Sequence, residues 1–227
     1  MLDISNEKYG WRNFKYYFLQ VSRPQSGWVV PIISVLLISI RILDIFNIIR
    51  WTYFSFLVRS NHKLKSDLFI DTTVVIKFIC AILIFYQSWY ENTYWLVLSI
   101  LFALTTFASI PEAIIFKSSR PIPSSYIRST VLGIFNYLEL VFHFASFYAY
   151  TNCLKFSGSS IGANVIEELD KIDYLYFSFI TVSTIGYGHL EITKDIGYKL
   201  VIGQAFIFLM FVLIFINLNI SKIEEVK

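Results

Sequence analysis

The stretch T-V-S-T-I-G-Y-G occupies residues 181–188 and follows a short apolar segment, D-K-I-D-Y-L-Y-F-S-F-I, that begins at Asp170. A helix of about a dozen residues cannot cross a bilayer, so this segment suits a re-entrant or core helix. Asp170 is placed to cap the start of the helix, with Asp173 in its first turn. Gly186 and Gly188 predict backbone dihedrals that other residues reach only with strain.

Long apolar runs surround this stretch. Of the 227 residues, 56% are hydrophobic and 15% are charged, whereas roughly a quarter of a soluble domain is charged. Five runs are long enough to cross a bilayer as helices. They cover residues 28–51, 68–90, 94–116, 126–152 and 196–218. The composition therefore predicts an all-α membrane protein. A formal charge of +3 without a basic stripe argues against nucleic-acid binding.

A basic linker rich in Pro and Ser, at residues 117–125, predicts a chain of two parts. The N-terminal part consists of a polar, basic segment at 1–27 and a membrane domain at 28–116. The C-terminal part is a membrane domain at 126–219, followed by a short tail at 219–227. Its expected segments, in chain order, are an outer helix at 126–152, a short helix at 170–183, the segment 184–188 and an inner helix at 196–218.

The sequence T-V-S-T-I-G-Y-G resembles the signature sequence of potassium channels. The order of helix, short helix, signature and helix is also similar to the two-helix pore module of that family. The resemblance runs from residue 126 onward and is not evident in the first 115 residues. It implies a homotetrameric, potassium-selective channel that crosses the cell membrane several times and conducts K⁺ passively. It implies no cofactor other than K⁺ ions held in the filter.

The resemblance implies that residues 184–188 form the selectivity filter. In such a filter, rings of backbone carbonyls replace the hydration shell of the ion. The carbonyls of Thr184, Ile185, Gly186 and Tyr187 would coordinate K⁺, and the Thr184 hydroxyl would add the innermost layer. Gly188 completes the filter. Because one chain supplies only one wall of the ring, four chains are expected to close it.

The residues on either side of the predicted filter carry further expectations. Thr181, Val182 and Ser183 end the short helix and are expected to support the filter. Many family members carry Asp directly after the filter and Glu in the short helix, but His189 and Ile180 occupy these positions. Carboxylate bracing is therefore in question. Two readings of His189 stay open: a ring of four imidazoles at the outer mouth that titrates near about pH 6–7, or a solvated side chain with no gating role.

The run at 196–218 is expected to line the pore, and it contains candidates for an inner gate. Gly203 is either a hinge or a small residue that allows close helix packing. Phe208, Phe211 and Phe215 form either a hydrophobic constriction that gates by dewetting or ordinary packing and lipid contacts. Both alternatives stay open for each residue.

Ionisable residues inside apolar runs are functional candidates by default, and five of them are singled out here. Glu139 and His143 are four apart and share a helical face, so they are candidates for a pair. Arg41 and Asp44 are three apart, and Lys77 lies in the second run. Structural pairing or snorkelling competes with a functional role for each. No run places Arg or Lys at every third position, so a conventional voltage sensor is not expected.

Two other functions compete with the potassium channel: a non-selective cation channel, and a non-conducting membrane subunit that acts with a partner. A regulatory partner of unknown kind is compatible with all three, and the gating stimulus stays open. An enzyme is not expected, because the sequence contains no phosphate loop, metal-ligand cluster or nucleophile–base pair. If the filter faces outward, the basic linker lies inside. The basic segment 1–27 then lies outside if the run 28–51 crosses, so that crossing also stays open.

Overall fold

The computed structural model describes residues 62–115, 126–157 and 169–223, together with four isolated helical positions at 32, 35, 39 and 40. Apart from those four positions, the predicted helix 28–51 lies outside the described residues. Arg41, Asp44 and the linker 117–125 also lie outside them. The chain divides into two compact units, one formed by residues 1–76 and 104–122, the other by residues 77–103 and 123–227. The predicted filter belongs to the second unit.

Helix α4 spans His62–Tyr86 and helix α5 spans Thr93–Ile115, with the 3₁₀ helix η1 at Trp89–Glu91 in the turn between them. Helix α4 begins before the predicted residue 68. The polar residues that precede the apolar run contain no helix breaker, and helical hydrogen bonds do not require lipid. The helix ends where Ser88 adopts a left-handed φ of 57°, a conformation that commonly terminates helices.

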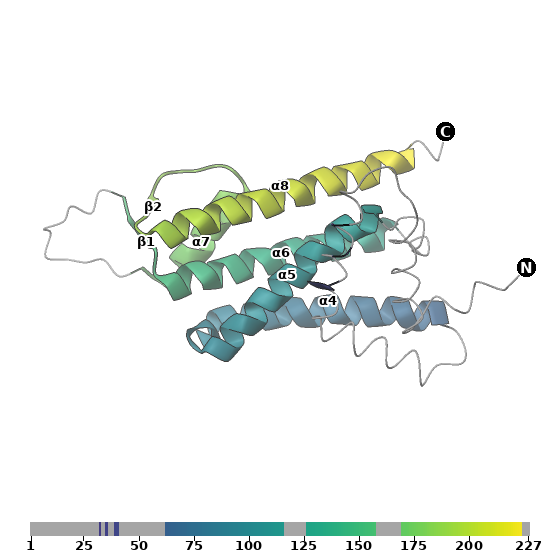
Figure 1. Cartoon of the computed structure of the whole chain (residues 1–227), viewed down its shortest axis with the longest axis horizontal. Coiled ribbons are helices and arrows are strands. Elements are labelled where there is room, and N and C mark those ends of the chain that lie inside the picture. The colour runs from purple at the N-terminus through teal and green to yellow at the C-terminus, as the bar shows by residue number, and fades with distance from the viewer. Residues whose placement is uncertain are drawn as a thin grey trace, which may run out of the picture. The chain divides into compact units, whose positions relative to one another are not determined.

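Helices α6, Tyr126–Thr151, and α8, Asp195–Ile223, run side by side in opposite directions (Figure 1). The short helix α7, Lys171–Val182, contacts both of them. Twelve residues of α-helix span about 18 Å, which is too short for a bilayer. Helix α8 continues past the predicted residue 218, because neither Gly nor Pro follows to end it.

A small β-ribbon adds to the predicted helices. Strand β1, Leu154–Phe156, follows α6, and strand β2, Leu190–Ile192, follows the predicted filter. They pair antiparallel, with Lys155 opposite Glu191. The ribbon therefore ties the end of α6 to the segment that leaves the predicted filter.

In the described part of the chain, three helical stretches are long and apolar enough to cross a membrane. They are Leu68–Tyr86, Thr130–Thr151 and Asp195–Leu213. Thr93–Ala108 in α5 is a shorter apolar stretch. These stretches, together with the short helix α7, are the elements of an all-α membrane protein, as the sequence predicts.

The core of the second unit lies where α6, α7 and α8 meet. The ring of Tyr148 on α6 packs edge-on against Phe177 on α7, with ring centroids 5.0 Å apart. The buried side chains around this contact are Leu140, Val141, Phe144, Ala145, Tyr174, Leu175, Ile180 and Phe208. The short helix is therefore fixed on one side by both long helices.

The first turn of α8 approaches the ribbon closely. A Cβ atom added to Gly197 would lie 2.6 Å from Cγ2 of Ile192 and 3.0 Å from Sγ of Cys153. Real Cβ atoms do not come that close to other atoms, so only glycine fits between the ribbon and α8. The contact sets the distance between α8 and the end of α6.

Candidate functional site

The start of α7 is anchored by two interactions. The N–H of Asp170 donates to Oδ2 of Asp173 at 2.8 Å, and this carboxylate also suits the positive end of the helix dipole. Nζ of Lys171 donates to the carbonyl of Tyr86 at the end of α4, also at 2.8 Å. The start of the short helix is thus tied to the membrane helix that precedes η1.

The end of α7 is closed by the first predicted filter residue. The Ile185 N–H donates to the Ile180 carbonyl at 3.2 Å, and the Thr184 N–H to the Thr181 carbonyl at 3.3 Å. These two bonds form a Schellman cap, in which the residue after the helix is left-handed and is usually glycine. Here that residue is Thr184, with φ of 57°. A β-branched residue is uncommon in this conformation, and such local strain concentrates at functional sites.

Positive φ values alternate along the predicted filter. Thr184 and Gly186 have φ of 57° and Gly188 has φ of 69°, whereas Ile185 and Tyr187 between them are not in the positive-φ region. This alternation allows successive carbonyls to face the same side of the segment. A Cβ atom on either glycine would meet nothing within 4 Å. Backbone conformation, and not lack of space within the chain, is therefore what favours glycine at both positions.

The hydroxyl groups next to the filter bond to nearby backbone. Thr181 Oγ1 donates to the Phe177 carbonyl at 2.7 Å, and Ser183 Oγ donates to the Phe179 carbonyl at 2.9 Å. Both bonds reinforce the last turn of α7. Thr184 Oγ1 donates to the Ser183 carbonyl at 2.7 Å. Val182, between them, is half-buried and packs against the core.

On the other side of the predicted filter, His189 is fixed to the ribbon. Its carbonyl accepts the Ser157 N–H at 2.9 Å, and its ring contacts Phe156 edge-on at 5.3 Å between centroids. Next to it, Glu191 accepts a hydrogen bond from Ser157 Oγ at 2.5 Å and lies 3.6 Å from Lys155 Nζ. The bond from Ser157, with the Lys155 ammonium, holds the pKa of the Glu191 carboxyl below its ordinary value.

A buried polar network that the sequence analysis missed joins α7 to both long helices. Gln204 on α8 accepts a hydrogen bond from the Tyr148 hydroxyl at 2.7 Å. Its Nε2 donates to Ser178 Oγ at 2.8 Å, and Ser178 Oγ donates to the Val141 carbonyl at 2.9 Å. The signal available in the sequence was weak: single Gln, Tyr and Ser residues within apolar stretches.

The inner-gate candidates lie in α8. Phe208 and Phe211 are buried against Tyr137 of α6, with ring centroids 4.7 and 5.6 Å away. This contact favours the packing alternative for both residues, because a side chain that faces the outer helix of its own chain cannot also line a central pore. Helix α8 is continuous through Gly203, where a Cβ would meet nothing within 4 Å. The side chain of Phe215 lies outside the described residues.

Charged and polar side chains meet in a second buried cluster, which joins α4, α5 and α6. Lys77 Nζ lies 3.3 Å from Glu139 Oε1 and also donates to the Phe102 carbonyl. The expected proximity of Glu139 and His143 is present, at 3.5 Å. His143 Nδ1 lies 2.6 Å from Ser99 Oγ. The structure thus brings together three of the five predicted ionisable residues, while Arg41 and Asp44 lie outside the described residues.

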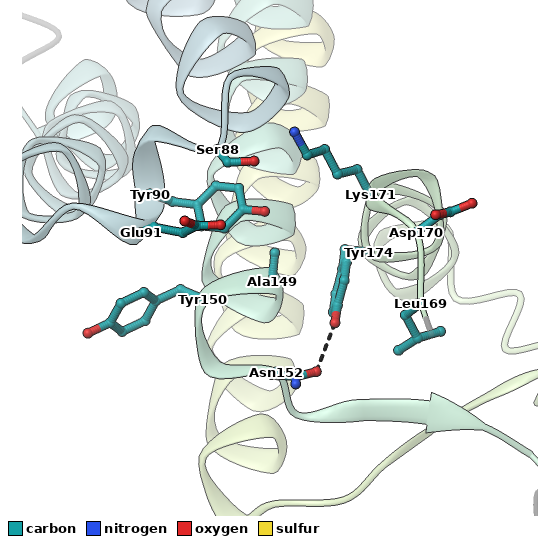
Figure 2. Close-up of a pocket in the computed structure, with 10 residues that line it drawn as sticks. All are labelled: Ser88, Tyr90, Glu91, Ala149, Tyr150, Asn152, Leu169, Asp170, Lys171 and Tyr174. Carbon is teal, nitrogen blue, oxygen red and sulfur yellow. Dashed lines mark hydrogen bonds between the residues drawn. The ribbon is translucent and has the colours of Figure 1, made fainter. Parts of the chain in front are cut away.

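A hollow of about 580 Å³ opens at the end of α6, away from the predicted filter. Figure 2 shows the Tyr174 hydroxyl donating to Oδ1 of Asn152 across one of its walls, at 2.9 Å. The other lining residues are Ser88, Tyr90, Glu91, Ala149, Tyr150, Leu169, Asp170 and Lys171. The hollow lies beside the start of α7 and not at its filter end.

Comparison with known proteins identifies the pore part of the chain. Residues 137–225, which contain most of α6, all of α7, the predicted filter and α8, match a family model described as an ion channel. No curated protein and no solved structure matches the chain at a significant level. The match covers the two long helices and the short helix between them, in the order that the sequence analysis predicted. The chain is therefore a membrane protein whose C-terminal part, residues 137–225, matches the potassium-channel-like family of two-helix ion-channel pores.

Proposed function

We propose that the chain is one quarter of a potassium-selective channel in which residues 184–188 form the filter. The observation that carries this proposal is the alternating positive φ at Thr184, Gly186 and Gly188, directly after a helix too short to span the membrane. Backbone carbonyls that face one side, repeated around an axis, supply the oxygens that a dehydrated cation needs. The carbonyls of residues 184–187 are the proposed K⁺ ligands. K⁺ is the transported ion, and conduction involves no chemical conversion.

Exposed apolar side chains support a homotetramer. In the single chain, Ile185 is 54% exposed and Tyr187 is 68% exposed, although both belong to the filter segment. Helix α8 also carries an exposed apolar stripe, opposite the side that packs on α6. The stripe consists of Ile202, Phe206, Leu209 and Leu213. Four copies around a central axis would cover these side chains with one another or place them along the pore.

The direction of α7 suits a cation. Its C-terminal end meets the filter at Thr184, and the C-terminus of a helix carries partial negative charge. In the proposed tetramer, four such ends converge below the filter and favour a cation there. The proposed location is the cell membrane, where a potassium gradient drives passive flow.

The reversal potential of the purified protein in a planar bilayer tests this function, with K⁺ on one side and Na⁺ on the other. We expect a reversal far towards the potassium equilibrium potential. Gly186→Ala tests the role of the filter conformation. The site has room for a methyl group, but alanine at positive φ costs about 1–2 kcal/mol. We therefore expect Gly186→Ala to assemble and to lose selective current.

One observation supports a second candidate function. Neither Ile180 nor His189 supplies a carboxylate that could brace the filter from α7, and a loosely held filter would pass Na⁺ as well as K⁺. A reversal potential near zero, with substantial current in wild type, would replace the selective channel with a non-selective cation channel. No current, together with co-purification of a stoichiometric partner, would instead indicate a non-conducting subunit.

A further inference from the structure

The network of Gln204, Ser178 and Tyr148 has its proton positions fixed by its surroundings. Ser178 Oγ donates its single hydrogen to the Val141 carbonyl, so the same oxygen can only accept from Gln204. The Gln204 amide must therefore turn its NH₂ group towards α7 and its oxygen towards Tyr148, whose hydroxyl must donate. All three side chains have 0% exposure. Bulk solvent therefore does not reach these bonds, and no member of the network carries a charge.

The network reaches the filter through the last turns of α7. Gln204 also donates to the backbone carbonyl of Ser178, at 3.2 Å. Ser178 lies just before Ile180 and Thr181, whose carbonyls accept the N–H groups of the first filter residues. A shift of Ser178 along or around the axis of α7 would therefore move both acceptors of the cap that starts the filter.

Stability alone does not explain a polar network at this position. Replacing both partners of a buried hydrogen bond with apolar groups of similar shape is nearly neutral for folding, and lipid and core side chains surround these helices. A fully satisfied polar network instead specifies one relative arrangement of the elements that it joins. Here it joins the outer helix, the short helix and the inner helix.

We propose that Gln204, acting through Ser178 and together with Tyr148, is a positioning residue of the filter. It holds the short helix at the one depth and rotation at which residues 184–188 keep their selective conformation. The inference deepens the proposed function and rests on it. It adds a residue of the inner helix, far from the filter in sequence, to the determinants of ion selectivity.

Tyrosine substitutions on α6 provide a matched pair for the test. Tyr148→Phe removes the hydroxyl that bonds Gln204, whereas Tyr150→Phe removes an exposed hydroxyl two residues along the same helix. We expect Tyr148→Phe to lower the K⁺ over Na⁺ permeability ratio about fivefold, the factor that corresponds to one net hydrogen bond. Tyr150→Phe is expected to keep the wild-type ratio in the same bilayer assay.

Substitution of Gln204 gives a signature that a purely structural role would not produce. In Gln204→Glu, the protonated acid can donate to Ser178 and accept from Tyr148, whereas the carboxylate can only accept. We expect its permeability ratio to be close to wild type in acid and to fall as the pH rises. Gln204→Leu is expected to show the lowered ratio at every pH.

Two results would overturn the inference. One is a wild-type permeability ratio in Tyr148→Phe and in Gln204→Glu at alkaline pH, whatever the change in their thermal stability. The other is equal amide hydrogen exchange at residues 179–185 in Tyr148→Phe and Tyr150→Phe, since a positioning role requires faster exchange in the former. The exchange measurement needs no selective current. If wild type itself reverses near zero, the proposed function fails, and exchange still decides whether the network positions the short helix.

Discussion

Glycine meets two different constraints in the C-terminal part of the chain. At Gly186 and Gly188 the backbone has positive φ and there is room for a side chain. At Gly197 the backbone needs no special φ, but Ile192 and Cys153 leave no room for a Cβ. At Gly203 the structure of the single chain shows neither constraint. Substitution of glycine is therefore expected to impair conduction at residues 186 and 188 and to impair folding at residue 197.

The contrast between Gly197 and Gly203 is directly testable. Gly197→Ala would place a methyl group 2.6 Å from Ile192 Cγ2, and overpacking of this kind typically costs about 1–3 kcal/mol. Gly203→Ala should be neutral or stabilising by up to about 1 kcal/mol, because alanine favours the helix. Thermal unfolding of both variants in the same detergent checks this. Loss of stability that is equal in the two would contradict the steric explanation.

Thr184 shows what the residue pattern could not predict. The glycines signal positive φ at residues 186 and 188, because glycine is the residue that adopts it without strain. A β-branched residue gives the opposite signal, so the left-handed conformation of Thr184 was visible only in the structure. Its use in place of glycine at the cap of α7 is explained by the proposed function, since glycine has no hydroxyl to offer to an ion.

The elements were predictable to different degrees for a physical reason. Long apolar runs identify helices well, but their ends mark where contact with lipid ends and not where helical hydrogen bonds end. For this reason the predicted bounds were too short: α4 begins before its apolar run, and α8 ends after its own. The ribbon has only three residues in each strand, too few to show an alternating pattern. Its partners are also separated along the chain by α7 and the filter, which no local pattern can reveal.

The same limit applies to the buried networks. The proximity of Glu139 and His143, 3.5 Å apart, followed from their spacing on one helix. The contacts of Glu139 with Lys77, and of Gln204 with Tyr148, join different helices and depend on how those helices pack. Hydropathy marks such residues as unusual within apolar runs, but it does not name their partners.

The ion pair between α4 and α6 carries a prediction at the level of elements. Lys77→Met would leave Glu139, which is fully buried, without its close cation, and breaking a buried pair typically costs about 3–5 kcal/mol. The double variant Lys77→Met with Glu139→Gln should recover most of that loss, because it removes both charges. Chemical denaturation in detergent measures each free energy of unfolding.

The control for this prediction is Lys199→Met, which removes an exposed lysine on α8. It should change the free energy of unfolding by no more than about 0.5 kcal/mol. If Lys77→Met and Lys199→Met behave alike, or if the double variant is no more stable than Lys77→Met, the pair does not join the two helices energetically.

The β-ribbon is expected to become less stable at acidic pH. The pKa of Glu191 is lowered in the folded protein by the hydrogen bond from Ser157 and by Lys155. Because its pKa is lower in the folded protein, the Glu191 carboxylate stabilises the ribbon at pH values above the pKa of glutamate in the unfolded chain, about 4.3. That stabilisation is lost as the pH falls through the lower, folded-state value. We expect protection of the Ser157 amide against hydrogen exchange, corrected for the intrinsic rate, to fall in that acidic range.

Glu191→Gln isolates the charge in this response. The amide oxygen can still accept from Ser157, but it cannot be protonated in this range, so the acid-dependent loss of protection should disappear. Glu91→Gln, an exposed glutamate on η1, should retain the wild-type response. An unchanged acid response in Glu191→Gln would assign it to another group.

For the whole molecule, the proposed tetramer predicts how mixed channels behave. Gly186→Ala should assemble normally, because its methyl group meets nothing in the chain, but its filter should not conduct. If one altered subunit disables the channel, co-expression with an equal amount of wild type leaves about one sixteenth of the current, the share of all-wild-type tetramers. Tyr150→Phe, which removes an exposed hydroxyl, should leave the current unchanged when it is mixed in the same way. A residual current of about one quarter would instead indicate a dimer.

The proposed filter is held at both ends by partners from elsewhere in the chain. Ser178 bonds to Gln204 on one side, and on the other the Thr193 N–H donates to the Cys153 carbonyl at 2.8 Å. One extra residue between these points would turn Leu190 from the core to the opposite face of the ribbon and separate Glu191 from Lys155. In evolutionary terms, insertions and deletions between residues 178 and 193 are removed, whereas substitutions can accumulate only at positions in this segment that need neither a positive φ nor a specific hydrogen bond. Related genes should therefore agree in length here.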